Sequence, residues 1–127
     1  MNELRGFLIK TNGECTEARI DREHELEELY RVCECNTIDI VSRKIAGDYY
    51  DITCDDEALL KTEPVFTAVS KDNYLMLCGN LFITRNNAAG ELADLTDDDV
   101  LRIQHSLLTM PDDRPLGLAK RLLLCEF

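Results

Sequence analysis

Alternating apolar and polar positions predict that much of this chain is β-strand. Between Tyr49 and Cys54, the residues Tyr50, Ile52 and Cys54 alternate with Tyr49, Asp51 and Thr53, as expected for a strand with one buried face. Turn-forming residues, such as Gly47 before this segment, separate the runs. The predicted strands cover residues 4–10, 37–45, 49–54, 65–69 and 74–84.

The last of these runs is apolar at both odd and even positions. A strand that is covered on both faces has this pattern, so residues 74–84 are predicted to form a central strand. Gly79 and Asn80 interrupt the run, and they predict a bulge or the close approach of another backbone.

Two segments have apolar residues at helical spacing. Asp21 is the expected N-cap of the first helix, which ends near Glu34. Its predicted buried residues are Leu26, Leu29, Tyr30 and Cys33.

The second helix is predicted to begin after Thr96, in the stretch Leu95 to Leu108. Thr96 is the expected N-cap, and Asp97, Asp98 and Asp99 fill the first turn, where free N–H groups and the helix dipole favour negative charge. The helix is predicted to end at Met110-Pro111 and to bury Val100, Ile103, Leu107 and Leu108.

The chain beyond residue 110 allows two interpretations. Leu116, Ala119, Leu122 and Leu123 have the spacing of a short third helix, which is the preferred interpretation, although residues 122–127 also fit an edge strand. A chain of 127 residues has room for one hydrophobic core. We therefore expect a single α+β domain over residues 1–127. It should contain a mainly antiparallel sheet of about five strands, with two or three helices packed on one face. The third helix would lie within residues 110–127.

The charge of the chain restricts its partners. With 25 acidic and 14 basic residues the net charge is −11, which disfavours direct binding to nucleic acid and to an anionic membrane and favours protein partners with a basic surface. The first ten residues lack the features of a secretory signal, so a cytoplasmic location is expected.

Motifs for cofactors, metals and catalysis are weak. The six glycines are scattered and form no phosphate-binding loop, and two histidines offer little for a hydrolytic triad. Cys33-Glu34-Cys35 lacks a second matched pair, so the six cysteines are predicted to be free thiols with no bound metal. No cofactor and no catalytic residue is predicted.

Acidic residues concentrate in residues 48–57 and 91–99, each of which contributes −5. If the two segments lie together, they form an acidic face that binds a basic protein surface; otherwise they are two separately solvated turns. The candidate residues of this face are Asp48, Asp51, Asp55, Asp56, Glu57, Asp94, Asp97 and Asp98.

Several stretches together resemble a family of small bacterial proteins known as domain of unknown function 3846, which is common on phages and conjugative elements. They are Leu26–Leu29, Ile38–Val41, Ile52–Leu60, Cys78–Ile83 and Leu95–Val100, and the resemblance extends from about Leu4 to Leu108. It implies an α+β fold and a mobile-element setting, and it brings no catalytic residues.

Three functional hypotheses remain open at this stage. The leading one is a non-catalytic accessory domain that binds another protein through its acidic side. The second is a DNA mimic that inhibits a restriction enzyme or another nucleic-acid enzyme, and the third is an enzyme with an unrecognised carboxylate or thiol site. The sequence leaves the oligomeric state open.

Overall fold

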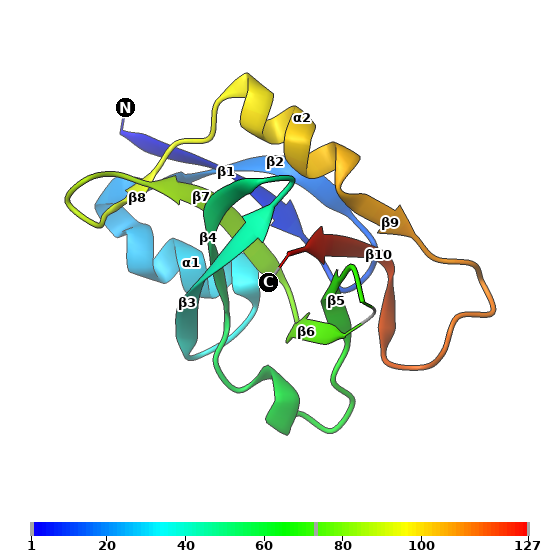
Figure 1. The fold of residues 1–127 in the computed structure, drawn as a ribbon. Coiled ribbons are helices and arrows are strands. Elements are labelled where there is room, and N and C mark those ends of the chain that lie inside the picture. Colours follow the sequence, from blue (N-terminus) through cyan, green and yellow to red (C-terminus); the bar gives the residue numbers. More distant parts are fainter. Residues whose placement is uncertain (1, 73, 127) are drawn as a thin grey trace.

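The computed structural model describes residues 2–72 and 74–126, and within them it contains ten strands, two α-helices and two short 3₁₀ turns (Figure 1). One sheet contains β1 (Glu3–Ile9), β2 (Cys15–Asp21), β3 (Ile38–Ile45), β4 (Asp48–Asp55), β7 (Leu81–Asn86) and β8 (Leu92–Ala93). The other contains β5 (Phe66–Ser70), β6 (Leu75–Cys78), β9 (Leu107–Thr109) and β10 (Leu118–Cys125). The helical elements are η1 (Arg22–His24), α1 (Glu25–Cys33), η2 (Ala58–Leu60) and α2 (Asp97–His105).

The larger sheet has the order β2-β1-β7-β4-β3, with β8 paired to β7, and all its pairs are antiparallel. The smaller sheet has the order β6-β5-β10-β9, in which β5 and β10 are parallel. The prediction of a mainly antiparallel α+β fold is confirmed, although the strands form two sheets instead of one.

The main core lies between the two sheets. Phe7 and Ile52 of the larger sheet pack in one cluster with Leu123 of the smaller sheet and with Val100 and Ile103 of α2. Because the inner faces of both sheets and one side of α2 contribute, this cluster holds the two sheets together.

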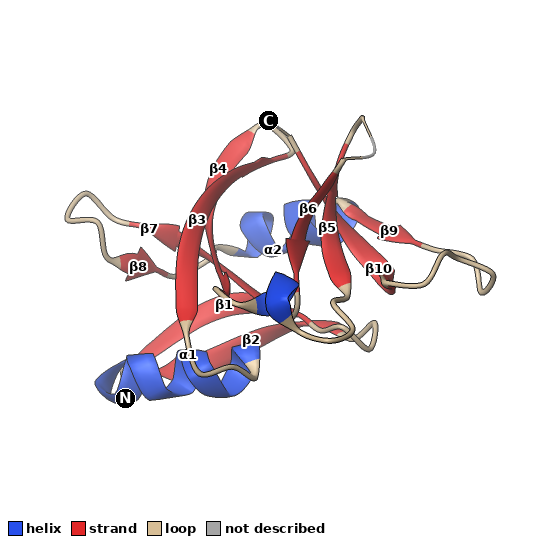
Figure 2. Ribbon diagram, turned by 90° about the horizontal axis from the view of Figure 1, so that it is seen from below, coloured by secondary structure: helices blue, strands red, loops and turns tan. Residues whose placement is uncertain are grey.

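A second core lies on the opposite face of the larger sheet. There Leu29 and Val32 of α1 pack against Leu4, Leu8 and Phe82. The two helices therefore cover opposite faces of the larger sheet, and the prediction that they share one face is wrong; Figure 2 shows them on different sides of β1. Successive residues of β1 point to opposite faces, which allows one strand to serve both cores.

The run of residues 74–84 is two strands, not one. Cys78 pairs with Phe66 in the smaller sheet, whereas Leu81 pairs with Ile9 in the larger one. Gly79, with φ +79°, turns the chain between them in a conformation that favours glycine. Odd and even positions of this run are both apolar because its two halves belong to different sheets.

The C-terminal segment is strand over Leu118–Cys125, so the predicted third helix is wrong. This strand lies between β5 and β9, not at an edge, and its pairing with β5 shifts register between Leu118 and Leu123. Because of this irregularity, Ala119 and Leu122 pack in a small separate cluster, whereas Leu123 packs in the main core between the sheets. A bulged strand that is buried on both faces therefore has apolar residues at the spacing expected of a helix. Phe127 lies outside the described residues.

The helices are confirmed with different limits. Asp21 accepts a hydrogen bond from the Glu23 N–H but caps η1, and α1 follows with Leu26 exposed and Val32 buried. The second helix ends at His105 because the chain then joins the smaller sheet as β9, which leaves Leu108 on the surface. The strands β2 and β8 were not predicted from the sequence.

Candidate functional site

Seven of the eight acids of the predicted face fall into three groups, and Asp51 lies apart from them. Asp48 lies at the start of β4, beside α2, while Asp55 ends this strand roughly 23 Å away, at about 3.3 Å per residue, and Asp56 and Glu57 follow it. Asp51 lies between them and accepts a hydrogen bond from the Asn86 amide at 3.3 Å. The third group, residues 94–98, lies at the start of α2.

Basic side chains neutralise four of the eight acids. Asp48 pairs with Arg85 and Arg102, Asp55 with Lys61, Asp94 with Arg22, and Asp97 with Arg5. Asp94 and Asp97 are brought together, since Asp94 also accepts the backbone N–H of Arg5 at 2.8 Å. Within the described part of the chain, the side chains of Asp56, Glu57 and Asp98 form no ion pair or hydrogen bond.

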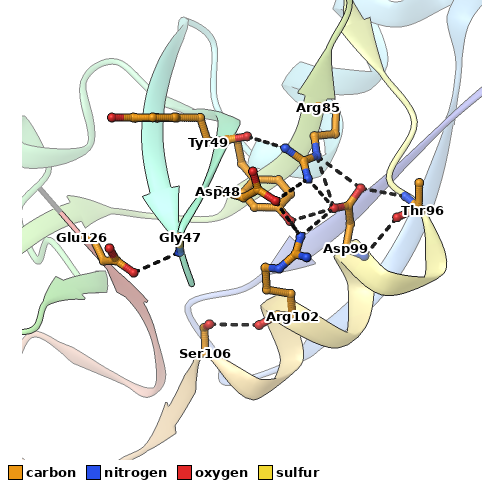
Figure 3. A network of polar contacts seen from close by, with 10 residues as sticks. Gly47, Asp48, Tyr49, Arg85, Thr96, Asp99, Arg102, Ser106 and Glu126 are labelled. Atoms are coloured by element: carbon orange, nitrogen blue, oxygen red, sulfur yellow. Dashed lines mark hydrogen bonds and ion pairs between the residues drawn. The ribbon is translucent and has the colours of Figure 1, made fainter.

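A polar network that was not predicted from the sequence joins β4, β7 and α2 (Figure 3). At its centre Asp99, 2% exposed, accepts hydrogen bonds from Arg85 Nη2 at 2.7 Å and from the Tyr50 hydroxyl at 2.7 Å. Arg102 donates to the Tyr50 oxygen at 2.7 Å, and the Arg85 guanidinium lies 4.2 Å from the centre of the Tyr50 ring. Three elements that are distant in sequence are thereby fixed to one another.

Asp99 also completes the helix cap. Its N–H donates to Thr96 Oγ1 at 3.1 Å, and its carboxylate accepts the Thr96 N–H at 2.9 Å, so the predicted N-cap is confirmed as a full capping box. Burial acts to raise the pKa of the Asp99 carboxyl, but the hydrogen bonds from Arg85, Thr96 and Tyr50 outweigh it and hold that pKa well below its usual range. Burial and the bond to Asp99 raise the pKa of Tyr50.

This network has the properties of a structural element. Every oxygen of Asp99 accepts a hydrogen bond, and both arginines also contact Asp48, so charge and hydrogen-bonding capacity are matched. An ionised carboxylate held by two arginines is a poor proton donor or acceptor near neutral pH.

A second polar cluster lies at the other end of β4. Asn80, 3% exposed, donates to the Val32 carbonyl at 3.0 Å and to Glu34 Oε2 at 2.6 Å, and its oxygen accepts the Thr11 N–H at 3.0 Å. Beside it Asp55 accepts from Lys61 Nζ at 2.9 Å. A cavity of about 240 Å³ is lined in part by Thr11, Glu34, Asp55, Lys61 and Asn80.

Two of the family-like stretches converge here, because Cys78–Ile83 supplies Asn80 and Ile52–Leu60 supplies Asp55. Asn80 ties the end of α1 to the β6–β7 junction and to the turn after β1. The sequence did contain a signal for it, an amide inside an apolar run. Its three partners could be found only from the fold.

The cysteines are free thiols in the structure, and four of the six are buried. Burial raises the pKa of Cys33 to about 12 and that of Cys54 and Cys125 to about 11. A thiol with such a pKa is a weak nucleophile at neutral pH. Within residues 2–72 and 74–126, no group of three or more His, Cys, Asp or Glu side chains could hold a metal ion.

The fold and its two polar clusters define a small two-sheet α+β domain that is braced at both ends of β4. None of its described helices is long and apolar enough to cross a membrane. The model of the family described as "Domain of unknown function (DUF3846)" matches residues 4–108, and the chain belongs to this family. No curated protein and no solved structure matches the chain. The strand β10 lies beyond the family match.

Proposed function

We propose that this protein is a non-catalytic accessory domain that binds a basic protein surface, in the cytoplasm of a cell carrying a phage or conjugative element. The observation that carries the proposal is the turn Asp56–Leu60, the first half of the connection from β4 to β5. In it Leu59 and Leu60 are 66% and 83% exposed, beside the carboxylates of Asp56 and Glu57, which have no partner among residues 2–72 and 74–126.

This combination fits a binding surface. Single exposed leucines are common, but two adjacent ones projecting from a turn give apolar area that a partner can cover. Acids without an ion-pair partner attract and orient a basic partner. Their binding free energy is not reduced by the cost of first breaking an ion pair with an arginine. Ala58, the other residue of the 3₁₀ turn, is buried and anchors it.

The distribution of ion pairs favours this proposal over a DNA mimic. A mimic requires acids free to replace phosphates along one face, and four of the eight candidates are paired with bases. The satisfied Asp99 network and the raised thiol pKa values support a non-catalytic role over an enzyme.

The test is quantitative capture of proteins from cells that carry the gene. We expect Leu59→Ser with Leu60→Ser to reduce capture about tenfold, as the loss of an apolar contact of about 1.4 kcal/mol would. The matched control is Leu116→Ser, since Leu116 is also exposed but lies in the turn before β10. Equal capture by all three proteins would refute the proposal, and competition by duplex DNA for the captured protein would support the mimic instead.

A further inference from the structure

β3 is an edge strand of the larger sheet, and its backbone shows which groups face outward. The Lys44 carbonyl accepts the Glu126 N–H at 2.7 Å, away from β4, whereas the Thr37 carbonyl accepts the Asp56 N–H on the β4 side. In an antiparallel pair the direction alternates with each residue, so Ile40 and Ser42 also present their N–H and C=O groups outward.

Side chains of β3 itself form hydrogen bonds with two of these outward groups. Asp39 Oδ1 accepts the Ile40 N–H at 2.9 Å, and Arg43 Nη1 donates to the Ser42 carbonyl at 2.9 Å. Both contacts are on the surface and join neighbouring residues, so a side-chain rotation releases them. The Asp39 carboxylate lies where a neighbouring strand would place a carbonyl group. The Arg43 guanidinium lies where such a strand would place an N–H group. Such contacts also protect an edge from unwanted pairing.

Two grooves meet at this edge, one on each face of the sheet. The first, here the α1 groove, has a volume of about 450 Å³ and an apolar floor that includes Leu29, Ile38 and Ile40. The second, here the β6 groove, has a volume of about 200 Å³ and includes Val41 and Leu77. Side chains of a strand added beside β3 would alternate between the two grooves.

The proposed binding turn forms part of the wall of the β6 groove, to which it contributes Asp56, Ala58 and Leu59. The edge of β3 and the Asp56–Leu60 turn are therefore parts of one surface.

The charges around the grooves select the occupant. Acids at the α1 groove are Glu25, Asp51 and Glu91, and its one base, Arg22, already contacts Asp94 and the Leu92 carbonyl. Acids at the β6 groove are Asp39, Asp55 and Asp56. A second copy of a chain with net charge −11 would bring the same acids to the edge, which disfavours self-pairing and favours a basic segment.

The geometry points to strand addition: β3 receives an extended segment of the partner protein, apolar at its centre and rich in Lys or Arg at its ends. The partner backbone takes over the outward groups of Ile40 and Ser42, and its apolar side chains enter the two grooves. This inference rests on the proposed function, because it specifies how the same surface binds its partner.

A synthetic peptide, Lys-Arg-Val-Ile-Val-Ile-Val-Arg-Lys, tests the inference directly. We expect amide hydrogen exchange at Ile40 and Ser42 to slow at least tenfold when the peptide is added, with no change along β2, the other edge of the sheet. A control peptide with Glu in place of every Lys and Arg should leave both amides unchanged. No protection by the basic peptide, or equal protection of β2 and β3, would overturn the inference.

Two variants at one position separate the backbone from the side chain. Ile40→Pro removes the outward N–H without removing a bond to β4, so peptide affinity should fall at least tenfold. Ile40→Val keeps the N–H and should bind within twofold of the original. Equal binding by a folded Ile40→Pro variant would overturn strand addition, and if that variant does not fold, the exchange measurement on the original protein decides.

The same variants distinguish failure of this inference from failure of the proposed function. If protein capture survives Ile40→Pro but is lost in the Leu59→Ser, Leu60→Ser variant, the proposed function stands and strand addition is refuted. If neither variant changes capture, both are refuted. A dimer of the original protein that Ile40→Pro dissociates would identify a second copy as the occupant and refute the basic partner.

Discussion

Replacing Asp99 by Asn tests the buried network most directly. The side chain keeps its size, but the negative charge is lost and an NH₂ group replaces one acceptor. Asp99 is 2% exposed and accepts from Arg85, Tyr50 and the Thr96 N–H, so at least one of these donors loses its acceptor. The two arginines lose the carboxylate that holds them next to Tyr50.

The magnitude follows from the number and exposure of these contacts. A hydrogen bond to a charged group contributes about 1.5–3 kcal/mol, and Asp99→Asn weakens several at once. The side chains of Arg85 and Arg102 are 29% and 31% exposed, so both can regain water and part of the loss is recovered. We expect the free energy of unfolding to fall by about 3 kcal/mol.

Asp98→Asn is the matched control, because Asp98 is exposed in the same first turn of α2 and its side chain has no partner within the described chain. Its loss should cost about 0.5 kcal/mol through the helix dipole alone. Urea denaturation of the three proteins, with fluorescence and circular dichroism compared, gives the two differences.

The effect should also depend on pH in a defined direction. Since the pKa of Asp99 is lower in the folded than in the unfolded protein, its charge stabilises the fold fully above about pH 5, and this contribution is lost as the pH falls below about 4. The difference between the original protein and Asp99→Asn should shrink over that range. Equal destabilisation by the two variants at neutral pH, or a difference that stays constant down to pH 3, would refute the reasoning.

Further predictions concern the cap, the turn, the amide cluster and the thiols. Thr96→Ala should cost about 1 kcal/mol of stability and leave partner capture intact, and an unchanged denaturation midpoint would contradict the capping box. Gly79→Ala should cost about 1 kcal/mol through its φ of +79° alone, since a Cβ there would lie 3.6 Å from Ala58; a loss above ~3 kcal/mol would indicate a clash instead. Asn80→Ala should lower stability by about 2 kcal/mol, because the Val32 carbonyl and the Thr11 N–H lose their partner; hydrogen exchange that is unaltered at Thr11 would argue against this. Thiol titration at pH 8 should find Cys33 unreactive in the folded protein and all six thiols reactive after unfolding, and rapid labelling of folded Cys33 would contradict its raised pKa.

Local patterns in the sequence determined the elements whose residues interact mainly with their neighbours in the chain. Period-two alternation predicted β3 and β4 to within one residue at each end. The N-cap at Thr96 was equally visible, because its hydrogen bond joins residues three positions apart. Net charge and scattered glycines likewise gave expectations about partners and cofactors, and these stay predictions.

Tertiary structure decided how these elements are used. Residues 74–84 and 118–125 are mostly apolar, and such runs are compatible with a helix, a central strand or two strands until their partners are known. Of the three aspartates after Thr96, the one at position 99 became the centre of a network because Arg85 and Tyr50 come from strands 14 and 49 residues away.

The edge of β3 depends on tertiary structure in the same way. Ile38 and Ile40 were predicted on one side of a strand, and the structure confirms that side, but which strand ends a sheet depends on the order of all the others. Strand order is set by contacts between residues far apart in the chain, whereas alternation is set by the direction of successive side chains on one backbone. The sequence therefore specified the faces of β3, and only the fold specified that this strand lies at the edge of the sheet.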